Sequence, residues 1–176
     1  GFTVFPTYRV DHQHRIMRLL GETDVPVPRM RWLEEDERVL GVPFYVMDRV
    51  DGRVPTDNPP YHVGGWVPDL SAAEREQLWW SGLDAMARVH RVDWQRLGFE
   101  FLAQPERGAT PLAQQLQEYD EFFAWGMERS RHPLVERAQR WLHAYRPPDG
   151  PTALCWGDAR IGNQIFDGTR CVAVID

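Results

Sequence analysis

The sequence predicts an α+β fold in which a helix and short strands come first, three helices follow, and a strand hairpin ends the chain. Apolar residues recur at helical spacing in 71–92 and in 110–129. Short apolar runs of the kind found in strands occupy 44–47 and 171–175. This order predicts two lobes seen in part, namely the end of a small lobe and most of a helical large lobe.

The N-terminal part of the sequence predicts one helix and short strands. Residues 8–20 carry an apolar stripe broken by polar residues. Arg31-Trp32-Leu33 and Val39-Leu40 flank an acidic patch at 34–37, which we interpret as a solvated hairpin connection. The run 44–47 is then expected to form a short buried strand.

Three longer segments predict the helices of the large lobe. Ser71-Ala72-Ala73-Glu74 is a capping box, because the hydroxyl and the carboxylate can each bond an unpaired backbone amide at the helix start. A wide apolar face places this helix in the core. Pro111 and Pro133 begin two further helices, since proline is favoured at the first helical position. In the last helix the residues expected to face inward are Leu134, Val135, Ala138, Trp141 and Leu142.

The composition is that of a globular protein and excludes several classes of partner. The chain has 176 residues, of which 43% are hydrophobic, and that length suffices to bury a core. No apolar run approaches the roughly 20 residues that span a bilayer. A formal net charge of −6 argues against a nucleic-acid or anionic-membrane surface. We therefore expect neither nucleic acid nor membrane as a partner.

The two cysteines and the two chain ends give further expectations. Cys155 and Cys171 lie in apolar strand patterns, so both are predicted to be buried, reduced thiols, which fits a cytoplasmic protein. The sequence begins at Gly1 without an initiator Met and ends inside an apolar run at Asp176. We therefore expect an internal fragment of a longer chain.

A tight turn is predicted near the end of the chain at Asp167-Gly168, because both residues tolerate the positive φ of such turns. Folding about this turn pairs Phe166 with Thr169 or with Cys171, depending on the length of the turn. In either register Asp176 returns beside the loop that precedes the hairpin.

That loop follows a strand expected at 154–156 and carries a carboxylate, Asp158, and a carboxamide, Asn163. Together with Asp176, three oxygen-bearing side chains are expected to converge. Carboxylate and amide oxygens are suitable ligands for Mg²⁺, and Asp158 is placed to receive a proton from an attacking hydroxyl. These are the parts that phosphoryl transfer in kinases requires.

The simpler alternative treats the same three residues as structural. Asp158 would cap a turn, Asn163 would form an Asx-turn, and Asp176 would be a surface residue at a strand end. The complete ordered set, with the hairpin turn between the last two residues, favours the magnesium site over this alternative.

The stretch Gly157-Asp158-x4-Asn163, followed by a strand that ends Val174-Ile175-Asp176, resembles the aminoglycoside phosphotransferase family, relatives of the protein kinases. It is particularly similar to the branch that includes the kinase-like domains found ahead of some acyl-CoA dehydrogenases. The resemblance implies Asp158 as catalytic base, and Asn163 and Asp176 as metal ligands.

The same resemblance implies a protein-kinase-like two-lobe fold, present in part. Residues 1–50 would be the C-terminal part of the small nucleotide-binding lobe. Residues 51–176 would be the large helical lobe with the catalytic loop, truncated at its C-terminus. The implied cofactors are ATP and Mg²⁺, and the implied partners are the nucleotide and a small molecule that bears a hydroxyl.

Exposed backbone between the two lobes holds adenine in this family. The resemblance implies that the Asp48 carbonyl and the Val50 amide bond the adenine edge, with Met47 near the face of the ring. Arg160, two residues beyond the proposed base, is expected to contact the transferring phosphate. The alternative for Arg160 is an ordinary surface arginine.

The sequence departs from the family pattern in three places. Trp156 stands where many members have His, and Gln13 stands at the position that matches the family's Glu, which pairs with a phosphate-binding lysine. All 20 basic residues are arginine, so the chain has no lysine for that role. These departures favour an alternative function, a non-catalytic nucleotide-binding module similar to a pseudokinase.

The combined prediction is a fragment of an ATP-dependent phosphotransferase that moves the γ-phosphoryl group to a hydroxyl of a small molecule. A hydroxyacyl thioester or an antibiotic-like metabolite is the expected acceptor. We expect the isolated fragment to be inactive. A third hypothesis, a helical interaction domain with a coincidental motif, predicts no nucleotide binding.

Overall fold

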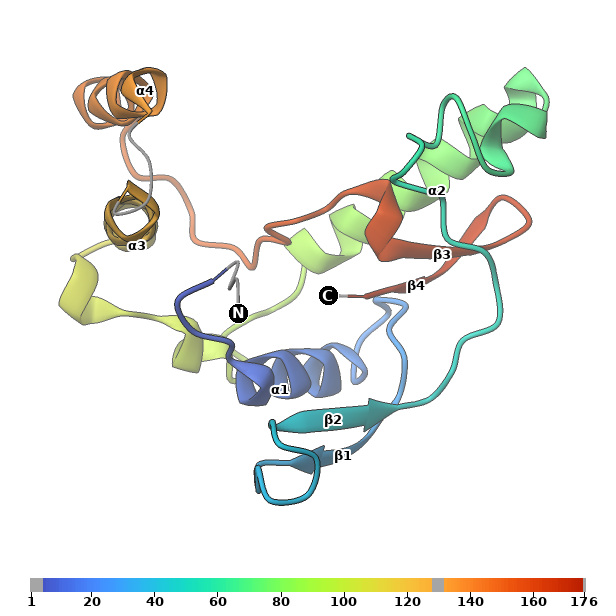
Figure 1. The fold of residues 1–176 in the computed structure, drawn as a ribbon, viewed down its shortest axis with the longest axis horizontal. Coiled ribbons are helices and arrows are strands. Elements are labelled where there is room, and N and C mark those ends of the chain that lie inside the picture. The colour runs from blue at the N-terminus through green and yellow to red at the C-terminus, as the bar shows by residue number, and fades with distance from the viewer. Residues whose placement is uncertain (1–4, 128–131, 176) are drawn as a thin grey trace. The chain divides into compact units, whose positions relative to one another are not determined.

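The computed structural model describes residues 5–127 and 132–175, and the chain divides into two compact units (Figure 1). The hairpin unit comprises Arg9–Leu97 and Ala153–Asp176, and the helical unit comprises Gly1–Tyr8 and Gly98–Thr152. The predicted lobe boundary after residue 50 stays a prediction. No helix in the described part of the chain is long and apolar enough to cross a membrane.

In the hairpin unit, α1 (Val10–Leu20) packs on a two-stranded antiparallel sheet of β1 (Met30–Glu34) and β2 (Phe44–Met47) (Figure 1). The helix begins two residues later than predicted. Its last turn supplies the buried side chains Met17, Leu19 and Leu20. The apolar stripe of α1 therefore covers one face of the sheet, as its sequence pattern requires.

The predicted hairpin connection is present between β1 and β2, and Val39 and Leu40 lie exposed within it. One prediction about this sheet is wrong. The strand β2 forms where it was expected, but it is not buried, because Val46 is 46% exposed and Met47 is 38% exposed. Successive side chains of a strand point to opposite faces, and the Tyr45 ring lies 6.4 Å from the His14 ring of α1. Val46, which pairs with the exposed Trp32, therefore lies on the face of the sheet away from α1 and meets solvent.

The long helix α2 (Ala72–His90) confirms the predicted capping box. The Ser71 backbone N–H donates to Glu74 Oε2 at 2.8 Å, and the Glu74 backbone N–H donates to Ser71 Oγ at 3.3 Å. Part of the wide apolar face predicted for this helix is buried and packs toward β4 (Arg170–Val174), whereas Trp79 is 49% exposed. The buried residues of the helix are Leu78, Gly82, Ala85 and Val89.

The predicted hairpin is present and joins β3 (Gln164–Asp167) to β4. Gly168 in the turn has a φ of +58°, a left-handed conformation that glycine adopts without strain. Of the two registers left open by the sequence, the structure has Phe166 opposite Cys171. A bulge between Ile165 and Phe166 then shifts the pairing, so that Gln164 lies opposite Val174.

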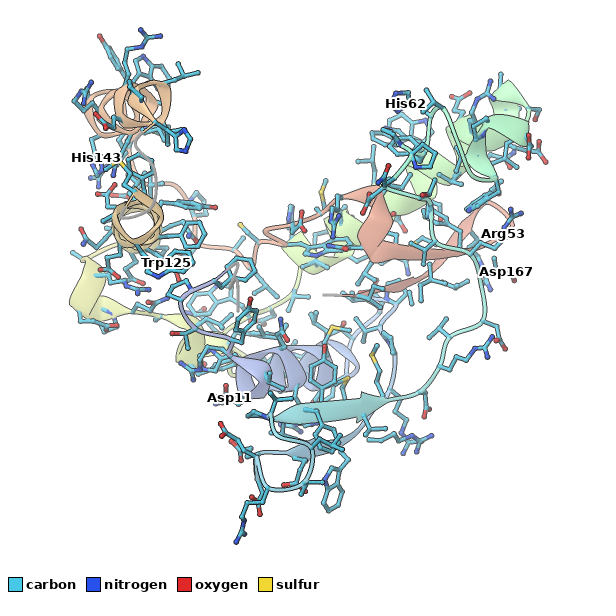
Figure 2. All side chains as sticks on the ribbon, in the orientation of Figure 1. Asp11, Arg53, His62, Trp125, His143 and Asp167 are labelled. Carbon is cyan, nitrogen blue, oxygen red and sulfur yellow. The ribbon has the colours of Figure 1, made fainter. Side chains whose placement is uncertain are left out.

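The other edge of β3 is bonded to the segment that follows β2. Arg53 and Phe166 exchange two backbone hydrogen bonds, of 2.8 and 2.9 Å. Trp66 packs against this junction: its ring lies 6.4 Å from the ring of Phe166 and 4.5 Å from the guanidinium carbon of Arg53, which lies beside β3 (Figure 2). With Phe166 only 1% exposed, β3 lies at the centre of the core.

The helical unit contains the short 3₁₀ turns Phe99–Leu102 and Pro105–Arg107, followed by α3 (Pro111–Met127) and α4 (Pro133–Ala144). The two helices contact each other through polar groups: Asp120 of α3 accepts hydrogen bonds from Gln139 and from His143 of α4 (Figure 2). The His143 Nε2 lies 2.8 Å from Asp120 Oδ2.

The expectation that the apolar face of α4 points inward is wrong. Leu134 is 68% exposed and Trp141 is 58% exposed. Val135, Ala138 and Leu142 are exposed as well. Helical periodicity identified the apolar face correctly, but the polar face of α4 is the one that contacts α3.

Two expectations about the stretch before the loop at 157–163 are also wrong. Residues 154–156 are extended but form no strand, because no neighbouring strand in the described chain pairs with them. Cys155 is consequently exposed, whereas Cys171 on β4 is buried as predicted, and both are free thiols. Burial raises the pKa of the Cys171 thiol to about 11.

This difference predicts selective labelling of the two thiols. With iodoacetamide at about pH 8, Cys155 should react, while Cys171 should remain unmodified because its thiol is buried and protonated below a pKa of about 11. Peptide mass spectrometry after a time course measures the two rates. In denaturant both thiols should react alike, and equal rates in the folded protein would contradict the described position of β4.

Candidate functional site

The loop between 157 and 163 is held in a compact form by its own backbone. The Arg160 N–H donates to the Asp158 carbonyl oxygen at 2.8 Å, and the Asn163 N–H donates to the Arg160 carbonyl oxygen at 3.0 Å. A short 3₁₀ turn, Ile161–Asn163, then leads directly into β3. The loop thus presents Asp158 to solvent, with 64% of its side chain exposed, and buries Asn163, which is 4% exposed.

The side chains of Asp158 and Asn163 meet, as the sequence predicted. Asn163 Nδ2 lies 3.0 Å from the Asp158 carbonyl oxygen and 3.1 Å from Asp158 Oδ2. Both partners are acceptors, so the amide nitrogen must be the atom that faces them. The amide oxygen Oδ1 of Asn163 is therefore left as an acceptor, which is the group that a hard cation such as Mg²⁺ would use.

The backbone of Asn163 is tied to the end of the hairpin. Its carbonyl oxygen accepts a hydrogen bond from the Ile175 N–H at 2.9 Å. Asp176, the second predicted metal ligand, lies outside the described residues. Among those that are described, no three His, Cys, Asp or Glu side chains gather closely enough to hold a metal by themselves. The contribution of Asp176 stays a prediction.

Arg160 lies beside the predicted base. Its Nε donates to Asp158 Oδ2 at 3.0 Å, and its Nη1 donates to a carboxylate oxygen of Asp57. Asp158 Oδ2 therefore accepts from both Arg160 and Asn163. Within the described chain no hydrogen bond reaches Asp158 Oδ1, which leaves that oxygen able to accept a proton.

The segment predicted to hold adenine also belongs to the hairpin unit. Asp48 N–H continues the strand pairing by donating to the Arg29 carbonyl oxygen at 2.8 Å. The Arg31 guanidinium donates two hydrogen bonds, of 2.6 and 2.7 Å, to the Asp48 carboxylate, and this pairing lowers the pKa of that carboxyl. Within the described residues, the Asp48 carbonyl and the Val50 amide make no hydrogen bond. Met47 lies half exposed just before them.

Two departures from the family pattern can be located. Gln13 is exposed on α1. Trp156 is half-buried, and its backbone N–H donates to His90 Nε2 at 3.4 Å. His90 at the end of α2 thus contacts the backbone two residues before Asp158.

Sequence reasoning missed Asp57 and Gln164. Asp57 lies 103 positions from its partner Arg160, and no local pattern marks it. Gln164 is 5% exposed, and its Oε1 is a buried oxygen with no hydrogen-bond partner in the described structure. Gln164 is a polar residue in an apolar strand pattern, directly after Asn163. This break in the pattern is the sequence feature that could have identified it.

Gln164 forms part of the wall of a cavity of about 270 Å³ between α2 and the loop. The loop side of the cavity includes Arg160, with Asp57 nearby, and the α2 side is apolar. The apolar lining residues on α2 are Leu78, Trp79, Leu83 and Met86.

Comparison with known proteins places the chain in a family. The model of the phosphotransferase enzyme family matches residues 4–176. The chain belongs to this family. The resemblance that the loop and hairpin residues indicated is confirmed over nearly the whole chain.

Similar proteins include two members of the acyl-CoA dehydrogenase family. Member 10 from Mus musculus is 28% identical over 177 residues, which cover 99% of this chain and 16% of that protein. Member 11 from Gallus gallus is 29% identical over 175 residues, which cover 96% of this chain and 21% of that protein. The phosphotransferase chain thus spans a small part of each of these relatives.

A solved structure confirms the predicted protein-kinase-like fold. The crystal structure of a candidate aminoglycoside phosphotransferase from Ralstonia eutropha matches with a TM-score of 0.71 at 29% identity. The match covers 95% of this chain and 49% of that chain. The mixed helix and strand arrangement therefore corresponds to about half of a phosphotransferase of this fold.

The contact between Gly82 and Gln164 predicts an unusual response to Gly→Ala substitution. Alanine in place of a helical glycine ordinarily stabilises by about 0.5–1 kcal/mol. A Cβ at position 82 would overlap Gln164 Oε1, so Gly82→Ala should instead destabilise by about 1–3 kcal/mol. Urea denaturation measures the free energy of unfolding.

The matched control is Gly126→Ala in α3, where a Cβ meets nothing within 4 Å. This variant should be neutral or slightly stabilised. The double variant Gly82→Ala with Gln164→Ala should recover part of the loss. Stabilisation by Gly82→Ala alone would contradict the described packing of Gln164.

Proposed function

We propose that this chain supplies the base and the nucleotide-binding residues of an ATP-dependent phosphotransferase that moves the γ-phosphoryl group to a hydroxyl of a small molecule. The observation that carries the proposal is the bonding of Asp158 to Asn163 within one loop of a phosphotransferase-family chain. This contact leaves one carboxylate oxygen of Asp158 and the amide oxygen of Asn163 available.

Asp158 acts as the base in this proposal. The acceptor hydroxyl donates its proton to Asp158 Oδ1 as its oxygen attacks the γ-phosphorus. The bond from that phosphorus to the bridging oxygen breaks, and ADP leaves with the electron pair. The hydrogen bonds from Arg160 and Asn163 to Oδ2 hold the carboxylate in place during this step.

Asn163 Oδ1 and Asp176 would hold Mg²⁺, which neutralises charge on the phosphate oxygens when it is bound. The engagement of Asn163 Nδ2 supports this assignment, because the remaining amide oxygen is the metal-binding atom. Arg160 contributes a second positive charge from the same loop. Catalysis of this kind depends on positioning and electrostatics.

The nucleotide base is proposed to bind at the segment after β2. The unbonded carbonyl of Asp48 and amide of Val50 offer an acceptor and a donor to the adenine edge, and the exposed Met47 side chain offers an apolar face. With adenine bound between the two lobes at residues 47–50, we propose that residues 1–50 belong to the small lobe and residues 51–176 to the large lobe.

The names of the similar proteins suggest two classes of acceptor. The relatives named as acyl-CoA dehydrogenases favour a hydroxyacyl thioester, and the structural match named as an aminoglycoside phosphotransferase favours an antibiotic-like metabolite. The free thiols of Cys155 and Cys171 fit a reducing compartment, and we propose the cytoplasm.

A second candidate function is a nucleotide-binding module without catalysis. It is favoured by the exposed Gln13 on α1 and by a sequence whose 20 basic residues are all arginine, which leaves no lysine for the phosphates. Both candidates predict ATP binding, so turnover separates them. ATP binding without phosphoryl transfer in the full-length protein would favour the module.

The substitution Asp158→Asn tests the base. In the full-length protein it should lower turnover of ATP by about 10²-fold or more, because the amide cannot accept the proton. The affinity for ATP with Mg²⁺ should change little, because Asp158 is not proposed to touch the nucleotide base. Turnover is measured by ADP release and affinity by calorimetry.

Asp167→Asn is the matched control, since Asn-Gly supports the same type of tight turn as Asp-Gly. This variant should retain unchanged turnover. Unchanged turnover in Asp158→Asn would show that the base is assigned wrongly. The isolated chain of residues 1–176 is expected to show weak or no turnover in the same assay.

A further inference from the structure

The guanidinium of Arg160 lies between two carboxylates that come from distant parts of the sequence. Nε bonds Asp158 Oδ2 at 3.0 Å, and Nη1 bonds Asp57. Asp57 belongs to the segment that follows the proposed adenine-binding residues. The two acids therefore share one cation, and no assigned role accounts for Asp57.

The position of Asp57 depends on a second, independent feature, the glycine at position 162. A Cβ at this position would lie 2.7 Å from Asp57 Oδ1 and 2.8 Å from Oδ2. The carboxylate thus lies directly against the backbone of the loop, at a position that carries no side chain. Pro55, two residues before Asp57, is fully buried and fixes the backbone of this segment to the core. The buried segment therefore brings Asp57 to the loop, and Arg160 is its hydrogen-bond partner there.

The sharing has a chemical consequence for the proposed base. A guanidinium with a single carboxylate partner tends to close into a two-bond pair that occupies both carboxylate oxygens. Such a pair with Asp158 would cover Oδ1, the oxygen that must accept the hydroxyl proton. The second bond of such a pair would come from Nη2, as it does in the pair of Arg31 with Asp48. With Asp57 holding the guanidinium by Nη1, only Nε reaches Asp158, through Oδ2. In the described chain Nη2 of Arg160 has no partner and can meet a phosphate oxygen.

We propose that Asp57 is a positioning residue of the phosphotransfer site: it competes with Asp158 for Arg160 and thereby keeps one oxygen of the base open. The inference rests on the proposed function of Asp158. Asp57 touches no reacting atom and acts through Arg160.

The positioning role and a merely structural ion pair predict different outcomes. The Asp57 and Arg160 side chains are 53% and 51% exposed, and exposed pairs of this kind contribute little to folding stability. Removing the Asp57 charge should therefore leave the melting temperature nearly unchanged. If Asp57 is a positioning residue, its removal should lower the rate of phosphoryl transfer and leave the KM for ATP unchanged.

The test uses the full-length protein with Mg²⁺ and ATP as the probe, water as the acceptor, and ADP formation as the readout. Asp57→Asn should lower kcat about tenfold, because Arg160 then closes onto Asp158, while the KM for ATP stays within about twofold. Asp57→Glu, which keeps the charge, should recover most of the rate. Asp69→Asn is the control. Asp69 is an exposed acid that, like Asp57, precedes α2 in the sequence, and this variant should retain the parent rate.

A double-substitution cycle decides whether Asp57 acts through Arg160. Arg160→Gln should lower kcat by itself, and adding Asp57→Asn should lower it no further, because the competing cation is already gone. Multiplicative losses, or an Asp57→Asn rate equal to that of the parent, would overturn the positioning role while leaving the proposed function intact. Absence of any ADP formation by the parent protein would overturn the proposed function, and this inference with it.

Discussion

The central constraint in this molecule is that β3 is hydrogen-bonded along both edges. Arg53 pairs with Phe166 on one edge, β4 pairs on the other, and the Ile175 N–H reaches the carbonyl oxygen of Asn163. Because the loop at 157–163 runs straight into β3, these bonds fix the depth and direction at which the loop leaves the core. The contact between Asn163 and Asp158 depends on that placement.

The same strand connects the proposed nucleotide site with the proposed base. Val50 lies three residues before Arg53, so the segment expected to hold adenine continues directly into the edge of β3. A few residues later the chain delivers Asp57 to Arg160. A displacement of this segment would therefore move the proposed adenine-binding residues together with Asp57, which is a physical basis for coupling between the proposed nucleotide site and the loop.

The parts of the fold that the sequence predicted well have local causes. The turn at Asp167-Gly168 and the capping box at Ser71 each depend on residues within a few positions of one another. The contacts between Asp57 and Arg160 and between Gly82 and Gln164 join residues far apart in the chain, so no spacing rule could show them. The apolar face of α4 could be found by periodicity, but periodicity does not say what covers it. Cys155 was misplaced for a related reason, since a strand requires a partner that its own sequence does not reveal.

The most direct measurement of the central claim is a crystal structure of the full-length protein with Mn²⁺ and a non-hydrolysable ATP analogue. Anomalous scattering locates the metal without reference to the assigned roles. We predict Mn²⁺ bound by the amide oxygen of Asn163 and a carboxylate oxygen of Asp176, with Asp158 beside the terminal phosphate. A metal–nucleotide complex bound elsewhere, with Asn163 making only its contacts to Asp158, would contradict it.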